Sequence, residues 1–427
     1  MAAKRQRSPE LIPNPFIKKQ NREWTLRAPQ DLLAAPDEAA TTAAIEAGHV
    51  AIDDHVAHFG AALARTTRVP YPDAAPHLSI DAYKALYETN VNSEHGAHFV
   101  IHQHDHPVAG THYDLRLQIN GTSSASWAVM YGMPGDANSF KLARNATETR
   151  VHCLWNHLIE TASATTGSLL IWDTGTYSVL KRRSKHAPAV DPSSQGEESE
   201  GEGVKTEQEK LHEAFRQRKI RIRLDGTRLP RPYVLNLRLT KTEDAEGRVK
   251  AKKSAERGRR RRRGGRGKEV EETSSEEEEV VEDDELDAVE PGSQQPNEEE
   301  VKGASAPTEM TDEMRRELEE QEDAQVRATN AYIGADNSIG SVHQRKWFLS
   351  LDREASGFVR TAKKGQKVVW RREGEEEADG KRLQYPFYVR GPEAERSVVT
   401  GRLAADVLRD EGVRGFFGRK GWRPVLR

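Results

Sequence analysis

The sequence predicts a mainly β protein, a small antiparallel β-barrel with flanking helices and long disordered inserts. Residues 99–104 and 112–119 alternate between apolar and polar side chains, as strands with one face in a core do. Asn120-Gly121 separates the second run from residues 126–130, and such a pair between alternating runs is a strong hairpin signal. Many short strands with turn residues between them are typical of an antiparallel barrel.

The remaining barrel strands are predicted from later runs of the same kind. Residues 169–172 and 176–180 flank the turn-like residues 173–175, so we expect a strand, a turn and a second strand there. A further pair of strands and one late strand are expected at residues 220–224, 233–239 and 346–351.

The composition indicates that part of the chain does not contribute to a core. Of the 427 residues, 31% are charged and only 35% are hydrophobic, which is low for a globular chain. The charges are segregated, with an arginine-rich tract at residues 257–268 followed by acidic runs such as residues 276–279. Such blocks do not fold by themselves. The basic tract is interpreted either as a nucleic-acid contact or as a solvated linker.

These patterns divide the chain into seven parts. We expect a basic disordered tail (1–30), a helical extension (31–96), the motif-bearing part of the barrel (97–183), a disordered insert (184–208), further barrel strands (209–241), a disordered basic then acidic insert (242–325), and a final barrel strand with a basic C-terminal helix and tail (326–427).

Several classes of protein are excluded by the residues that are present. The single cysteine, Cys153, allows no intramolecular disulfide and no cysteine-rich zinc site. The first residues are basic without a following apolar stretch, and no run of about 18 apolar residues occurs. We therefore expect a protein that is neither secreted nor bound in a membrane. Short basic clusters such as residues 4–7 indicate the nucleus, with the cytoplasm as the alternative.

A line of polar residues on one predicted strand indicates a metal site. Every second side chain of a strand shares a face, so His112, Asp114 and Arg116 point the same way. Imidazole and carboxylate ligands together suit Mn²⁺, Zn²⁺ or Fe²⁺ better than Mg²⁺. The arginine, one step further along, is placed to bind a phosphate oxygen of a substrate on the same ion.

A second alternating group lies just upstream. His102, His104 and His106 occupy every second position of the preceding strand. One of them completes a His/His/Asp site if the two strands are neighbours.

The C-terminal segment is basic and contains aromatic residues. Residues 381–427 hold 11 Lys/Arg against 5 Asp/Glu, a net charge of +6. Phe416, Phe417 and Trp422 lie among the cations, a combination that suits phosphate contact and base stacking. We interpret the cations as nucleic-acid contacts and the aromatic side chains as docking the tail onto the barrel.

The motifs together resemble the 3′-phosphoesterase module of bacterial ATP-dependent DNA ligase D. The resemblance rests on blocks in the same order, and is dense over residues 97–180 and thinner through 216–240 and 345–352. The blocks are FVIHQH at 99–104, HYDLRL at 112–117, NG at 120–121, SWAV at 126–129, KLA at 141–143, His152, and GSLLIWDTGT at 167–176. No ligase or polymerase segment accompanies them, so the chain is interpreted as a stand-alone homologue.

The resemblance implies a small β-barrel that trims 3′ ends of DNA, removing terminal ribonucleotides and 3′-phosphates with a divalent metal, typically manganese. By position, it implies that His104, His112 and Asp114 are the metal ligands. Arg116 and His152 are implied to contact the phosphate. The implied partners are nucleic-acid 3′ ends, together with repair proteins bound through the charged inserts.

Three departures from the family pattern bear on activity. The spacing between the first two histidines is longer here, so His104 is preferred and His106 is the alternate first ligand. Asn156 stands where the family has a catalytic tyrosine, and it can donate a hydrogen bond but cannot act as a phenolic acid. Tyr131 stands where the family has a lysine. The two replacements leave two functions open: a 3′-end phosphoesterase, or an inactive module that binds nucleic-acid ends. A cupin-like metal oxygenase would explain the histidines but not Arg116.

Overall fold

A computed structural model describes residues 45, 52–73, 75–181, 205–263, 324–361, 368–372, 381–419 and 422–426, and for 253–263 it describes the backbone alone. The predicted tail at residues 1–30 lies outside these residues, as do residues 184–204 of the insert predicted at 184–208 and residues 264–323 of the longer insert. The end of the first insert was predicted wrongly, because a helix begins at Glu207.

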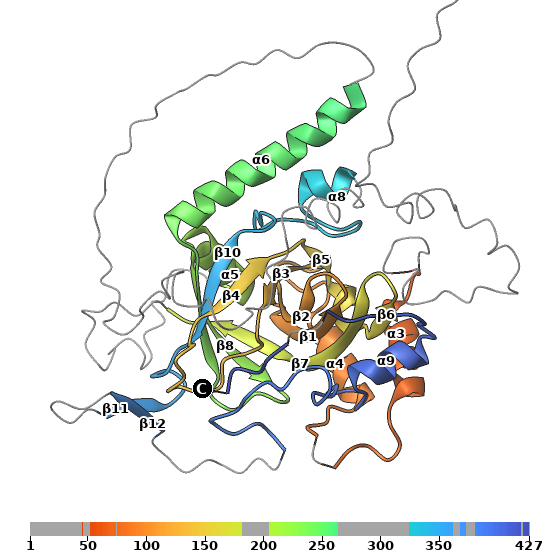
Figure 1. Cartoon of the computed structure of the whole chain (residues 1–427), viewed down its shortest axis with the longest axis vertical. Helices are drawn as coiled ribbons and strands as arrows, with labels where there is room; N and C mark the ends of the chain where they lie inside the picture. The colour runs from red at the N-terminus through yellow and green to blue at the C-terminus, as the bar shows by residue number, and fades with distance from the viewer. Residues whose placement is uncertain are drawn as a thin grey trace, which may run out of the picture.

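Eight antiparallel strands of the described chain close into a barrel, which confirms the predicted fold class (Figure 1). Around the barrel the order is β1, β2, β3, β4, β10, β9, β8 and β7, and β7 pairs back with β1. These strands are β1 (His98–His106), β2 (Gly110–Gln118), β3 (Ser123–Val129), β4 (Arg144–Glu148), β10 (Lys346–Leu351), β9 (Val234–Arg238), β8 (Lys219–Gly226) and β7 (Gly167–Val179). Short strands β5 (His152–Cys153) and β6 (Thr161–Ser163) add to β3 and β7, and β11 (Phe358–Thr361) pairs with β12 (Val369–Arg372).

Of two predicted turns, one is confirmed and one is wrong. Asn120-Gly121 lies in the hairpin between β2 and β3, as predicted. The turn predicted at residues 173–175 was wrong, because β7 is one continuous strand with an irregularity in its pairing to β1. Gly175 is required there by close packing instead: a Cβ at this position would lie 2.0 Å from the Asp225 carbonyl oxygen on β8.

The alternation along the strands separates an inner from an outer face. Phe99, Ile101 and Leu115 belong to the core inside the barrel. Helix α5 (Glu207–Arg216) contributes Leu211 and Phe215 to the same core.

The outer face of β1 and β7 is buried under a second layer. This layer consists of α3 (His55–Thr66), α4 (Ile80–Asn90), the 3-10 helix η1 (Leu154–Leu158) and residues 398–399, which pack on Val100 and Ile171. Ser79 caps α4, since its hydroxyl accepts the N–H of Ala82. The even-numbered side chains of β1 and β2 therefore point into a covered layer rather than into bulk solvent.

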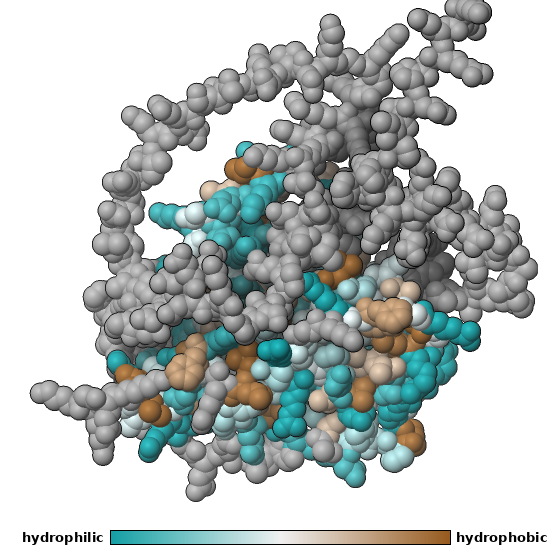
Figure 2. Space-filling view, in the orientation of Figure 1, coloured by the Kyte–Doolittle hydropathy of each residue, from teal (hydrophilic) through white to brown (hydrophobic). Residues whose placement is uncertain are grey.

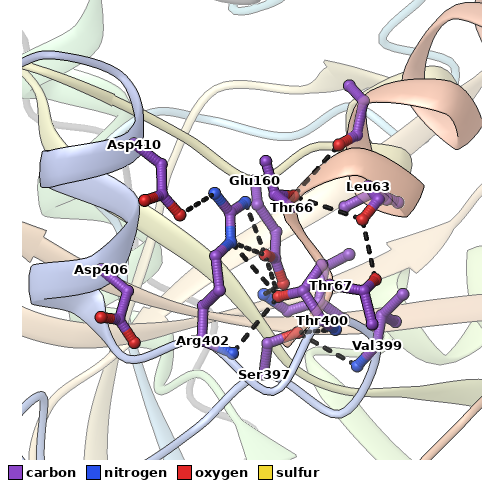
Figure 3. Close-up of polar contacts among 12 residues, drawn as sticks. Leu63, Thr66, Thr67, Glu160, Ser397, Val399, Thr400, Arg402, Asp406 and Asp410 are labelled. Atoms are coloured by element: carbon purple, nitrogen blue, oxygen red, sulfur yellow. Dashed lines mark hydrogen bonds and ion pairs between the residues drawn. The ribbon is translucent and has the colours of Figure 1, made fainter. Parts of the chain in front are cut away.

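The C-terminal part of the chain is fixed to this layer by a buried ion pair (Figure 3). Glu160 and Arg402 are 0% and 1% exposed, and Nη2 of Arg402 lies 2.9 Å from Oε2 of Glu160. The same oxygen accepts the hydroxyl of Thr400 at 2.6 Å. Helix α9 (Ala404–Asp410) follows directly, and Asp410 binds the other end of the guanidinium at 3.4 Å.

The start of the insert predicted to be disordered is a helix, so the prediction is corrected for residues 242–263. Helix α6 (Lys241–Arg263) leads away from the barrel in Figure 1. Its first turns are held by Asp244, which binds Arg345 at 2.6 Å and Arg248 one turn later at 3.0 Å. The charged composition concealed this helix because lysine, arginine, glutamate and alanine are also strong helix formers.

The described surface on the face shown in Figure 2 is mainly hydrophilic, and its hydrophobic residues lie in small separate groups. None of the helices in the described ranges has both the length and the apolar character required to cross a bilayer.

Candidate metal and phosphate site

Pairing of β1 with β2 brings the candidate ligands together. His104 on β1 is the register partner of His112 on β2, and His102 is the partner of Asp114. Because the odd-numbered neighbours point into the barrel core, these side chains share the outer face. The predicted line of polar groups is therefore present, and the preceding strand lies beside it as the site requires.

His104, His112 and Asp114 form one compact group, and one ligand atom from each lies within 4.8 Å of the others. Nδ1 of His104 is 3.5 Å from Oδ2 of Asp114, and Nε2 of His112 is 3.4 Å from Oδ1. The side chains of His104, His112 and Asp114 are 19%, 9% and 7% exposed, so only His104 is appreciably open to solvent.

Backbone carbonyls fix the orientation of both imidazoles. Nε2 of His104 donates to the Thr166 carbonyl oxygen at 2.8 Å, and Nδ1 of His112 donates to the Gly110 carbonyl oxygen at 2.8 Å. The ring nitrogens that face Asp114 are Nδ1 of His104 and Nε2 of His112, and each can donate a lone pair to a cation once it carries no proton. Such second contacts are what metal-ligating histidines usually make.

The group fits a divalent cation. Oδ1 of Asp114 is buried and accepts no hydrogen bond among the described residues, an arrangement that costs about 1–3 kcal/mol unless a positive group satisfies it. Two imidazole nitrogens and a carboxylate suit Mn²⁺, Zn²⁺ or Fe²⁺. A centre with three protein ligands keeps further coordination positions for substrate, as catalytic sites do.

The electrostatics favour an ionised carboxylate and a neutral His112. Burial by itself would raise the pKa of Asp114. Its contacts with His112, His104 and Arg116 nevertheless hold that pKa well below its usual range. Burial also lowers the pKa of His112, which keeps its ring neutral and able to donate a lone pair. At His104, burial opposes the charged form, yet the hydrogen bond to Asp114 raises the pKa above its ordinary value.

Arg116 lies beside the ligand group and is 3% exposed. Its Nη2 is 3.3 Å from Oδ2 of Asp114, and its Nη1 donates to the side-chain oxygen of Asn156 on η1. Its Nε is buried without a hydrogen-bond acceptor among the described residues. Asn156 therefore orients the guanidinium and leaves it a donor to offer to an anion.

His152 comes from β5, whose backbone pairs with Ser124 on β3. Burial, followed by the charge of Arg116, holds the pKa of His152 well below its ordinary range. The imidazole is therefore neutral, with one ring N–H to donate. Its buried Nδ1 has no hydrogen-bond partner among the described residues.

The alternate first ligand, His106, has a different role. Its Nδ1 accepts the backbone N–H groups of Val108 and Ala109 at 3.1 and 3.0 Å, and burial lowers its pKa to about 3. It therefore stabilises the turn between β1 and β2. The ring of Tyr131 lies 6.4 Å from that of Trp422, with Lys141 above it at 5.7 Å.

Two residues that sequence reasoning did not identify also contact the site. Thr166 supplies the carbonyl that orients His104, and the ring of Tyr332 packs against that of His152 with centroids 4.7 Å apart. Neither belongs to a motif, and Tyr332 lies beyond the long insert. No local pattern in the sequence indicates either contact.

The C-terminal tail lies against the β1–β2 hairpin that carries the ligands. Nη1 of Arg419 donates to the Val108 carbonyl oxygen at 3.1 Å. Trp422 packs on Tyr113 and donates to the Arg390 carbonyl oxygen, so this aromatic residue docks the tail as predicted. Phe417 is 84% exposed, so the docking interpretation was wrong for that residue.

Comparison with known protein families gives one match. Residues 102–237 match the model of the DNA Ligase D 3′-phosphoesterase domain, a range that holds His104, His112, Asp114, Arg116, His152 and Asn156. No curated protein matches the chain. The matched range contains seven of the eight barrel strands in whole or in part, together with the His/His/Asp group. Residues 102–237, and with them the His/His/Asp group, are therefore similar to the DNA Ligase D 3′-phosphoesterase domain.

Proposed function

We propose that this protein is a divalent-metal-dependent phosphoesterase, with Mn²⁺ as the preferred metal, that removes a 3′-phosphate or a 3′-ribonucleotide from DNA during repair. The observation that carries the proposal is the convergence of His104, His112 and Asp114 within 4.8 Å, with Arg116 directly beside them. The family match over residues 102–237 supports the choice of DNA 3′ ends as substrate.

The side chains provide complementary functions around a bound phosphate. A divalent cation held by His104, His112 and Asp114 would polarise a phosphoryl oxygen and orient a water molecule. Arg116, already aligned by Asn156, offsets the charge that develops on the phosphoryl oxygens in the transition state. His152, being neutral, donates its one N–H to another phosphate oxygen.

A direct assay tests this function. Three primers that end in a 3′-phosphate, a 3′-ribonucleotide and an ordinary 3′-hydroxyl are incubated with Mn²⁺ or with EDTA. We expect Mn²⁺-dependent conversion of the first two primers, no conversion of the third, and none in EDTA, measured as a shift on a denaturing gel. If neither modified end is converted with Mn²⁺, Zn²⁺ or Fe²⁺, hydrolysis is contradicted.

A second candidate function, binding of DNA ends without turnover, is favoured by one observation. Asn156 replaces the family's tyrosine and its oxygen accepts from Arg116, so the matching position supplies no phenolic hydroxyl. The same three primers separate the two functions, because a binding module would retain the modified ends selectively and leave them intact.

The exposed part of the tail is proposed to contact the single-stranded DNA that leads to the site. Replacing Phe417 by alanine should weaken binding of a 3′ overhang about tenfold, because a stacked base contributes roughly 1–3 kcal/mol. Fluorescence anisotropy measures the affinity. The matched control is Phe348→Ala on β10, opposite β1 in the barrel order. Equal affinities of the two variants would contradict a stacking role. Removing the whole tail is less informative, since Trp422 packs on the barrel core.

Two further parts of the proposal concern regions outside the described residues. The acidic runs near residues 276–279 are proposed to recruit repair proteins, and the basic cluster at residues 4–7 is proposed to direct the protein to the nucleus.

A further inference from the structure

A pocket lies next to His152 on a part of the chain outside the family match. Helix α8 (Ala324–Thr329) and the loop that follows it line a pocket of about 340 Å³, which is within the size range of small-ligand sites. Tyr332, Ile333 and Asp336 are among the lining residues, and none of the described residues that line it is a lysine or an arginine. A pocket with one carboxylate and no cation does not favour a phosphate, and an uncharged group suits it better.

The loop is fixed to the strand that carries His152. Val151 and Ala331 form a parallel β-bridge, and the N–H of Tyr332 donates to the Val151 carbonyl oxygen at 2.9 Å. The thiol of Cys153 donates to the Ile333 carbonyl oxygen at 3.3 Å. Gly334 continues the loop at φ +86°, a conformation that favours glycine. The position of the pocket relative to His152 is therefore set by backbone contacts of Val151 on one side and by the thiol of Cys153 on the other.

Tyr332 connects the pocket to the phosphate site. Its ring centroid is 4.7 Å from that of His152 with an interplanar angle of 56°, and the residue is 40% exposed. Ile333, beside it, is 65% exposed. An aromatic ring that packs on a phosphate-binding histidine while it lines an adjacent pocket is placed to stack on the base next to that phosphate.

We propose that this pocket binds the nucleoside adjoining the scissile phosphate, with Tyr332 as its stacking surface. The inference rests on the proposed function, because it takes His152 as a phosphate contact. Asp336 adds an acceptor at the pocket wall for a sugar hydroxyl or a base amino group. The amide of Asp336 is held by the Ser123 hydroxyl at 2.8 Å, which fixes its backbone.

Binding without turnover tests the proposal. Two 3′-phosphate primers, one with a normal terminal base and one abasic at that position, are titrated by anisotropy in EDTA. The wild-type protein should bind the base-bearing end about tenfold more tightly, the effect of one stacked base. Tyr332→Ala should abolish this difference, whereas Tyr332→Phe should keep it.

The control is Phe348→Ala, which removes an aromatic side chain of the same 40% exposure from β10. This variant should retain the preference for the base-bearing end, and thermal unfolding should show that all three variants fold. If wild type binds both ends equally, or if Tyr332→Ala keeps the preference, the inference is overturned. A protein that converts no primer can still prefer the base-bearing end, and an active phosphoesterase can lack that preference. Failure of the proposed function is therefore distinguishable from failure of the proposed nucleoside pocket.

Discussion

Asp114→Asn is expected to abolish both metal binding and hydrolysis. The carboxylate is the only anionic member of the ligand group and lies within 3.5 Å of both imidazoles. Asparagine keeps the shape but loses the charge that holds a divalent cation. Purified wild type should contain about one Mn²⁺ per chain after equilibration and the variant should contain almost none. The rate should fall on the order of 10³-fold, because a Lewis acid contributes several kcal/mol to the transition state.

Two matched variants separate loss of metal from loss of catalysis. Arg116→Met keeps the ligands and a similar side-chain volume, so metal content should be unchanged while kcat falls about 10²–10³-fold. Asp105→Asn makes the same chemical change on the same hairpin, where the carboxylate accepts the Thr111 hydroxyl at 2.8 Å. This second variant should retain metal and activity. Equal metal content in wild type and Asp114→Asn would remove the basis of the assignment.

Arg402→Met should give the largest loss of stability. Its guanidinium, 1% exposed, makes two contacts with the fully buried Glu160, at 2.9 and 3.2 Å. Removing the arginine leaves a buried carboxylate without its ion partner, which costs about 3–5 kcal/mol. The free energy of unfolding from urea titration should fall by that amount. The double variant Glu160→Gln/Arg402→Met should recover part of the loss, because no charge is then left uncompensated.

The control for this comparison is Arg409→Met on the neighbouring helix α9. Arg409 is 63% exposed although it lies 2.7 Å from Asp406. An exposed pair of this kind contributes about 0–1 kcal/mol. If Arg402→Met and Arg409→Met destabilise the protein equally, the buried pair does not hold the C-terminal segment as the geometry indicates.

The candidate metal face could be predicted from the sequence because strand alternation is a local property. His112, Asp114 and Arg116 share a face in any extended segment, and a single preceding turn brings His104 beside them. Strand alternation alone could not decide between His104 and His106 as the first ligand. It depends on the register of β1 with β2 and on which histidine accepts the backbone N–H groups of the turn.

Other features escaped prediction because contacts distant in sequence decide them. Residues 173–175 carry turn signals, but pairing with β1 and β8 extends them into one strand. The packing of the Tyr332 ring on His152 depends on a β-bridge between Val151 and Ala331, which lie far apart in the sequence. Helix α6 was not predicted for a different reason. The high charge of residues 242–325 as a whole concealed the helix-forming residues at their start.

The position of β10 has a consequence for how the barrel is completed during synthesis. This strand lies between β4 and β9, yet it follows them in the chain, after residues 264–323. A nascent chain that has emerged only as far as β9 presents two unpaired strand edges, and open edges recruit other chains. A fragment cut to residues 102–237 would keep those edges permanently. We expect such a fragment to aggregate, and a separately supplied peptide that spans residues 341–352 to restore a monomeric barrel.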